Sequence, residues 1–236
     1  MSANQPSLPG AHEPRSGARW WAGLPSWIWP FWIIVAIVGI GSAVGIVLVS
    51  HRTAVSSGPS SPIARWAAGV KRAPNFNLVD QAGKPLSMTA FHGRPVIVTF
   101  IDPTCRNLCP REASIISQAA AKLGSARPAI VAVSVDPWSD STHNFQVDAG
   151  RWHLAPGWLW GVGSYARLAR VWKSYGVAVV VAKHTYAGVA IRKITHTEAA
   201  YVVDPSGHER ALLLYPFTTK DVVSAVKGAL SGSGSS

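Results

Sequence analysis

Cysteine, methionine and acidic residues are scarce in this chain of 236 residues. There are two cysteines and two methionines, and 11 Asp and Glu residues stand against 22 Lys and Arg residues. Two cysteines are too few for a disulfide-stapled small domain or for a four-cysteine zinc or iron–sulfur site. Two methionines likewise exclude a methionine-rich copper relay. Because charged residues make up 14% of the chain and hydrophobic ones 48%, a disordered protein is also excluded.

The basic excess gives a formal net charge of +11, which suits anionic lipid, an acidic protein surface or nucleic acid. The basic residues are scattered, and no run is longer than Lys71-Arg72 or Arg192-Lys193. A nucleic-acid-binding stripe would gather them on one segment. We therefore expect no nucleic-acid partner.

A long uncharged segment near the N-terminus predicts a single transmembrane helix. Residues 28–49 contain no charge and are rich in Ile, Val and Gly, and 22 helical residues span roughly the 30 Å of a bilayer core. Tryptophans crowd the leading edge, as at a membrane interface. A cleaved signal peptide would have a shorter apolar region, of about 7–15 residues, and a small-residue cleavage site. The segment is thus interpreted as an uncleaved anchor, although its flanking arginines are too balanced to set its orientation.

The rest of the chain divides by composition. We assign residues 1–25 to an N-terminal tail, 26–50 to the anchor, 51–69 to a flexible Ser/Gly/Pro-containing linker, 70–230 to a globular domain and 231–236 to a disordered Gly/Ser tail. A domain of about 160 residues is large enough to bury a core.

Strand and helix patterns alternate in the globular domain. Apolar runs predict strands at 96–101, 129–135, 177–182, 199–203 and 210–215, and helical periodicity begins at 110, 165 and 218. This order predicts an α/β fold whose sheet has a parallel portion and a hairpin. Four tryptophans of the domain, at 152, 158, 160 and 172, are expected in its core.

The two cysteines lie four residues apart, directly after the first predicted central strand. Cys105 falls in the loop that leaves the carboxyl end of this strand, where open α/β sheets place their sites. Cys109 precedes Pro110 near a helix start, where the helix dipole and Arg106 are expected to lower a thiol pKa. Two sulfurs at this spacing suit a disulfide or a soft metal ion. Two inert cysteines or a stabilising disulfide remain the structural alternative.

Here the chain resembles the Sco/SenC (PrrC) family. The family pattern Cys-x-x-x-Cys-Pro is met by Cys105, Cys109 and Pro110, and the Ser-Val-Asp-Pro strand end is met at 134–137. His196 lies five residues before the strand segment beginning at Tyr201, as in the family pattern. The resemblance covers nearly all of residues 70–230.

This resemblance implies a thioredoxin-like mixed sheet flanked by helices, and a membrane-anchored protein that delivers a copper ion to the binuclear copper site of cytochrome c oxidase. It also implies that Cys105, Cys109 and His196 are the metal ligands. Two thiolates favour Cu(I) and an imidazole also permits Cu(II), while zinc is compatible with the same ligand types. The expected partners are a copper-accepting oxidase subunit and the membrane, through the single N-terminal helix.

One departure from the family pattern favours a second function. The spacer Arg106-Asn107-Leu108 replaces the family's usual Pro and acidic residue, and a positive charge there stabilises thiolates but opposes a bound cation. The alternative is therefore a thiol–disulfide oxidoreductase, in which Cys105 attacks and Cys109 resolves. Both functions belong to extracytoplasmic metalloprotein maturation, so we expect a single-pass plasma-membrane protein with its soluble domain outside the cytoplasm.

Other candidate ligands are interpreted as structural. Asp136 and Asp140 are expected to be strand-end and helix-capping residues, and His92 a turn residue. His184 follows a predicted strand closely enough to be considered for the site, but it is not assigned to it.

Overall fold

The computed structural model of the chain describes Pro30 and residues 64–231. The tail at 1–25, the anchor at 26–50 apart from Pro30, and most of the linker at 51–69 therefore lie outside the described residues. So does the C-terminal tail, apart from Ser231. Among the residues that are described, no helix is both long enough and apolar enough to cross a membrane.

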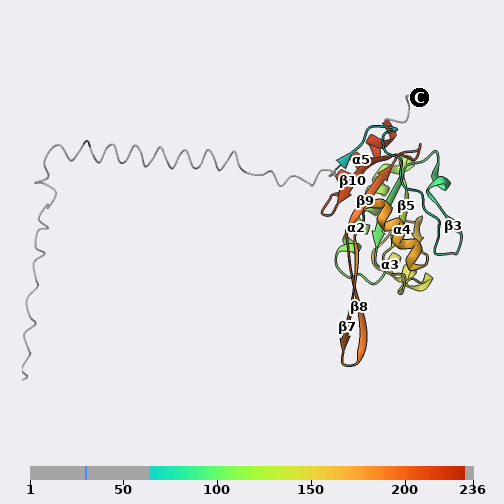
Figure 1. Cartoon of the computed structure of the whole chain (residues 1–236). Coiled ribbons are helices and arrows are strands. Elements are labelled where there is room, and N and C mark those ends of the chain that lie inside the picture. Colours follow the sequence, from blue (N-terminus) through green and yellow to red (C-terminus); the bar gives the residue numbers. More distant parts are fainter. Residues whose placement is uncertain (1–29, 31–63, 232–236) are drawn as a thin grey trace, which may run out of the picture. The chain divides into compact units, whose positions relative to one another are not determined.

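A six-stranded mixed sheet lies at the centre of the described domain (Figure 1). Its order is β1-β10-β9-β4-β5-β6, with β4, β5 and β6 parallel and the β4–β9, β9–β10 and β10–β1 pairs antiparallel. The strands are β1 (Ala64–Arg65), β4 (Val96–Ile101), β5 (Ala129–Ser134), β6 (Trp158–Gly161), β9 (Ala199–Val203) and β10 (Glu209–Leu214). The predicted α/β sheet with a parallel portion and a hairpin is confirmed. β1 adds an edge strand before residue 70, where the domain was predicted to begin.

The parallel strands are buried because their sequences are apolar on both faces. Every residue of β4 and of β5 is buried, in the register that pairs Val96 with Ala129 and Ile101 with Ser134. Continuous Val- and Ile-rich runs are typical of strands covered on both sides. The carboxyl end of β4 thus leads from a rigid core into the loop that carries the cysteines.

Helices cover the two faces of the sheet. α2 (Leu108–Leu123) and α5 (Thr219–Ser231) contribute to the apolar core on one face, where Trp152, Trp158 and Trp160 also lie. α4 (Tyr165–Tyr175) packs on the other face and buries Trp172. The prediction that these four tryptophans are core residues is confirmed. α3 (Thr142–Arg151) begins after Ser141, whose hydroxyl accepts a hydrogen bond from the Asn144 N–H.

Two elements differ from their predicted boundaries by more than one residue. α2 begins at Leu108, two residues before Pro110, because the Asn107 side chain caps it and accepts a hydrogen bond from the Leu108 N–H. The strand predicted at 177–182 begins at Val179 and continues to Tyr186. Short elements complete the domain: β2 (Leu78–Val79), β3 (Pro85–Leu86), η2 (Met88–Phe91) and η3 (Gly124–Ala126).

A separate two-stranded hairpin projects from the domain body (Figure 1). It consists of β7 (Val179–Tyr186) and β8 (Val189–His196), paired antiparallel from Val179–His196 to Tyr186–Val189. No residue of either strand is fully buried. β8 was not predicted, because its exposed sequence lacks the apolar run that marks the core strands. Its last residue is His196, so the hairpin carries a predicted ligand back to the body.

Candidate metal centre

The loop after β4 is shaped around Asp102. The Asp102 carbonyl accepts a hydrogen bond from the Cys105 N–H at 3.1 Å, and its carboxylate accepts from the Thr104 N–H and hydroxyl at 2.6 and 2.8 Å. These bonds make a tight Asp-centred turn. As a result, Cys105 lies directly in front of the first turn of α2.

Several groups around Cys105 lower its pKa, although its sulfur also lies 3.0 Å from the side-chain oxygen of Asn107, which can only accept. The Cys109 thiol and the backbone N–H groups of Asn107 and Cys109 lower the Cys105 pKa to about 6, against the opposing effects of burial and of the Glu198 charge. The Cys109 N–H lies 3.4 Å from the Cys105 sulfur. Donors at a helix N-terminus favour an anion in this way. The lowering of a thiol pKa that was predicted from the position of Cys109 at the helix start is wrong for Cys109 and is found at Cys105 instead.

Cys109 has the opposite character. It lies on the first turn of α2, is completely buried, and its pKa is raised by its hydrogen bond to Cys105, by burial and by the nearby Glu198 charge. The two cysteines are both free in the structure. The pair therefore consists of a partly exposed thiolate and a buried thiol that can donate to it.

His196 presents a ring nitrogen to the sulfur of Cys109. Its Nδ1 lies 3.2 Å from the Thr197 carbonyl oxygen, which can only accept, so we assign the proton of the neutral ring to Nδ1. The Nε2 lone pair then faces Cys109 Sγ at 3.7 Å. A hydrogen bond that fixes the tautomer in this manner is typical of a histidine metal ligand.

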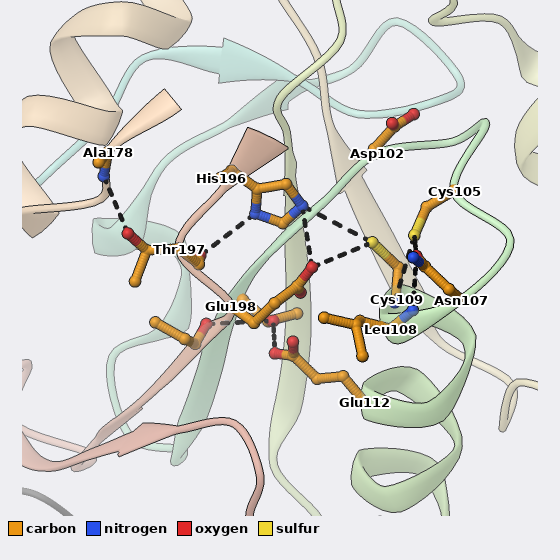
Figure 2. A network of polar contacts seen from close by, with 12 residues as sticks. Asp102, Cys105, Asn107, Leu108, Cys109, Glu112, Ala178, His196, Thr197 and Glu198 are labelled. Atoms are coloured by element: carbon orange, nitrogen blue, oxygen red, sulfur yellow. Dashed lines mark hydrogen bonds and ion pairs between the residues drawn. The ribbon is translucent and has the colours of Figure 1, made fainter. Parts of the chain in front are cut away.

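Glu198 completes the group in Figure 2. Its Oε1 lies 3.3 Å from His196 Nε2 and 3.8 Å from Cys109 Sγ. One potential ligand atom from each of Cys109, His196 and Glu198 falls within 4.8 Å of the others. Sulfur, imidazole nitrogen and carboxylate oxygen thus converge on one point, beside the Cys105 thiolate.

A second carboxyl group lies behind this point. Glu112 is completely buried on α2, and its Oε1 accepts a 2.5 Å hydrogen bond from the Thr99 hydroxyl of β4. Burial raises its pKa well above the usual range, and the neighbouring Glu198 carboxyl raises it further. Glu112 is therefore a neutral carboxylic acid, whereas Glu198 sits in front of it at the site.

The site opens to solvent through a small pocket. The pocket has a volume of about 180 Å³, and Cys105, His196 and Glu198 lie on its wall together with Leu108 and Lys193. A metal ion needs far less space, so the remaining volume is accessible to a ligand from another molecule. The donor set itself fits a soft or borderline cation such as copper or zinc.

The sequence profile of the SCO1/SenC family matches residues 67–231, more than two thirds of this chain. The chain belongs to the SCO1/SenC family. The family recognised from the cysteine and histidine pattern is therefore confirmed. A search of curated proteins gave no match.

Solved Sco structures share the fold. Apo Sco1 from Thermus thermophilus is 24% identical, with 74% of this chain and 100% of that chain covered and a TM-score of 0.60. Copper-bound ScoI from Bradyrhizobium japonicum is 23% identical, covering 67% and 99%, with a TM-score of 0.56. BsSco, described as having a disulfide switch and as a member of the Sco family of cytochrome c oxidase assembly proteins, is 22% identical, covering 73% and 98%, with a TM-score of 0.54. The predicted thioredoxin-like mixed sheet with flanking helices is confirmed.

Arg106, the departure from the family spacer, has its charge paired by an acid of α3. Its guanidinium donates to the Cys105 carbonyl at 3.0 Å and pairs with Asp148 Oδ1 at 3.5 Å. Asp148 is buried on α3, so the positive charge of Arg106 is balanced by this carboxylate. The expectation that Arg106 helps to lower the thiol pKa is wrong, since the groups that lower it are the Cys109 thiol and backbone donors.

The other candidates lie away from the centre. His184 is on the exposed outer part of β7, and His92 is exposed after η2. Asp136 accepts from the Trp138 N–H at the end of β5, as expected for a strand-end residue. Asp140 is not a helix cap, because Ser141 takes that role; its carboxylate accepts from the Ser134 hydroxyl and the Trp160 indole N–H instead.

Sequence reasoning missed both glutamates of the site, although spacing could have indicated them. Glu198 lies two residues after His196, and alternate residues of an extended chain point to the same side. Glu112 lies three residues after Cys109, which places both on one helix face. The sequence could not show that the side of the extended segment carrying Glu198 packs against the face of α2 carrying Glu112.

Proposed function

We propose that this protein binds copper through Cys105, Cys109 and His196 and delivers it to the binuclear copper site of a respiratory oxidase. The observation that carries this proposal is the approach of His196 Nε2 to Cys109 Sγ at 3.7 Å, with the Cys105 sulfur 3.4 Å from the Cys109 N–H and on the wall of the same pocket as His196. The donors come from elements more than 80 residues apart in the sequence, since Cys109 and His196 are separated by 87 positions.

The ligand chemistry supports copper as cargo. Two sulfurs favour Cu(I), and an imidazole allows Cu(II) as well. A site with three protein ligands facing an open pocket leaves room for a ligand of the acceptor, so copper can pass by stepwise ligand exchange. ScoI from Bradyrhizobium japonicum has been solved with copper bound, which supports the same cargo here.

We further propose that residues 26–50 anchor the protein in the plasma membrane as a single span, with the copper-binding domain on the extracytoplasmic side. The support is the uncharged segment at 28–49, and delivery to an oxidase copper site requires that side. The net charge of +11 suits an anionic membrane surface and an acidic acceptor subunit.

Thiol–disulfide exchange is the second candidate, favoured by the unequal cysteines. The Cys105 thiolate would attack a client disulfide and release one client thiolate, which takes the Cys109 proton. Cys109 would then attack Cys105, forming the Cys105–Cys109 disulfide and releasing the second client thiolate. Two electrons pass to the client in this step. BsSco is described as having a disulfide switch, which supports a redox function for a family member such as this chain.

An anaerobic copper titration of the reduced full-length chain in detergent tests the first proposal. We expect one equivalent of copper to bind, binding to be lost in Cys105→Ser and Cys109→Ser, and affinity to fall in His196→Ala. His184→Ala is the matched control, because it removes an exposed histidine from the same hairpin. Absence of copper uptake together with rapid, cysteine-dependent disulfide exchange would replace the copper proposal with the oxidoreductase.

A further inference from the structure

The Glu198 carboxylate is the least expected group at the metal centre. Its side chain is 13% exposed, and Nε2 of the neutral His196 ring lies 3.3 Å from its Oε1. Its second oxygen, Oε2, is buried without a hydrogen-bond partner. A carboxylate removed from water is costly unless it is paired or coordinates a metal. The neighbouring Glu112 acid can share its proton with this carboxylate, but it brings no positive charge, and no lysine or arginine pairs with Glu198 in the described part of the chain. A bound cation would supply that charge.

The backbone holds Glu198 and His196 on the same side of the chain. Between them, the Thr197 N–H donates to the Ala178 carbonyl at 3.0 Å, and the Thr197 hydroxyl accepts from the Ala178 N–H at 3.2 Å. After them, the Glu198 carbonyl accepts from the Tyr215 N–H at 3.1 Å. Pinned on both sides, the extended segment directs both side chains toward Cys109 (Figure 2).

The distances within the group suit a shared ion. Glu198 Oε1 is 3.8 Å from Cys109 Sγ and 3.3 Å from His196 Nε2, while Cys109 Sγ and His196 Nε2 are 3.7 Å apart. Three potential ligand atoms at these separations surround a point that each can reach. With Nδ1 bonded to Thr197, the imidazole faces this point with its lone pair rather than with a proton.

We propose that Glu198 is a further ligand of the bound copper and that it biases the site toward Cu(II) over Cu(I). This inference rests on the proposed copper-binding function and specifies the oxidation state that the site prefers. Two sulfurs alone favour Cu(I), whereas nitrogen and oxygen ligands in a tetragonal arrangement favour Cu(II). The negative charge of a carboxylate in a poorly solvated site stabilises the more highly charged ion further.

The neighbouring acid Glu112 provides a matched control. It lies three residues from Cys109 and against Glu198, but it is held by the Thr99 hydroxyl and does not reach the group of ligand atoms. Glu112→Gln keeps the size of the side chain and its neutral state. Comparing it with Glu198→Gln therefore separates the loss of a ligand from a change near the site.

The experiment measures Cu(II) and Cu(I) affinities of the full-length chain by competition, together with the electron paramagnetic resonance spectrum of the Cu(II) form. For Glu198→Gln we expect Cu(II) affinity to fall at least ~10-fold, a size already typical of losing an outer partner of a metal site. The Cu(I) affinity and the thermal unfolding midpoint should be retained, and the Cu(II) spectrum should change. Glu112→Gln should match the unsubstituted chain in affinity and spectrum.

A second variant keeps the inference testable if the Glu198→Gln protein does not fold. Glu198→Met replaces the hard oxygen by a soft thioether in a mostly buried place, and should reverse the preference by tightening Cu(I) relative to Cu(II). A tenfold change in the ratio of the two affinities corresponds to a shift of about 59 mV in the potential of this one-electron couple. The potential of the methionine variant should therefore rise.

The outcomes separate this inference from the proposed function. Unchanged Cu(II) affinity in Glu198→Gln would overturn the role of Glu198 while leaving copper binding intact. Reduced affinity with an unchanged Cu(II) spectrum would overturn it as well, because the carboxylate would then act through its charge and not as a ligand. If the unsubstituted chain bound neither ion, the copper function itself would fail, and this inference with it.

Discussion

The domain body and the β7–β8 hairpin differ sharply in burial, yet each supplies part of one site. All six residues of β4 are buried, whereas neither β7 nor β8 contains a buried residue. Cys109 follows the buried strand at the start of α2, and His196 ends the exposed one. The sulfur ligands are thus fixed by the core, while the imidazole is fixed by a few hydrogen bonds at the base of the hairpin.

This difference has a functional consequence. A region with few buried apolar contacts opens at a lower free-energy cost than a packed core. Movement of β8 would withdraw His196 and leave the metal on the two cysteines, without unfolding the body. Such a division suits a protein that must both hold copper and release it.

The largest expected effect on stability comes from a substitution in the core of the domain body, and it tests the contrast in burial between the body and the hairpin. Phe100 on β4 is completely buried and makes edge contacts with Tyr175 and Tyr201, at centroid distances of 5.6 and 6.2 Å. Phe100→Ala should lower the free energy of unfolding by about 3–5 kcal/mol, because it leaves a cavity. Urea unfolding followed by tryptophan fluorescence measures this. A small loss, similar to that of an exposed hairpin residue, would break the contrast.

The second prediction concerns the two cysteines of the body. The Cys105 pKa is lowered to about 6. The rate at which iodoacetamide alkylates Cys105 in the reduced, metal-free chain should therefore reach half its maximum near pH 6. A free cysteine would reach that point near pH ~8.5. Cys109, buried and with a raised pKa, should stay unmodified while the chain is folded. Mass spectrometry of the labelled chain distinguishes the sites, and equal labelling of both would contradict the assignment.

The third prediction concerns Glu112, where the body meets the residues that follow the hairpin. Its pKa is raised above the usual 4.5, so the folded chain keeps a proton that the unfolded chain releases. This contribution to stability is complete below pH 4.5 and is lost as the pH rises toward the folded-state pKa. Relative to Glu112→Gln, the free energy of unfolding should fall by up to about 1.4 kcal/mol per pH unit in that window.

Parallel denaturation curves of the two proteins between pH 4 and 9 measure this slope. If the difference in free energy of unfolding between the two proteins did not change with pH, Glu112 would gain no proton on folding. The position of Glu112 behind the site, and not in it, predicts that Glu112→Gln binds copper as the unsubstituted chain does at neutral pH.

The smallest expected effect is on the hairpin. Tyr186, at the outer end of β7, is 76% exposed. Tyr186→Ala should therefore change the free energy of unfolding by less than about 0.5 kcal/mol, as is usual for surface positions. The same urea experiment as for Phe100 applies. A loss of several kcal/mol would show that the hairpin is part of the cooperative core.

Core burial determined how much of the fold could be predicted. The strands at 96–101, 129–135 and 199–203 were found because continuous apolar runs are required where both faces of a sheet are covered. β8 has no such requirement, since most of its side chains are exposed, and its sequence carried no strand signal. The start of α2 was misplaced because Asn107 caps it before the more conspicuous Pro110.

The site divides in the same way. Cys105 and Cys109 could be predicted from local sequence, because one loop and one helix turn bring them together. His196 could be assigned only through the family resemblance, and Glu198 was missed, because their positions depend on how the hairpin returns to the body. The pKa difference between the two sulfurs also depends on tertiary burial, which a sequence does not state.

The most direct test of the central claim is X-ray absorption spectroscopy of the full-length chain loaded with one equivalent of Cu(I). If the body and the hairpin share the metal, the spectrum must contain two sulfur ligands and one imidazole nitrogen, and the imidazole contribution must vanish in His196→Ala but not in His184→Ala. A spectrum with sulfur ligands alone, identical in the unsubstituted chain and in His196→Ala, would contradict the claim that copper joins the two regions.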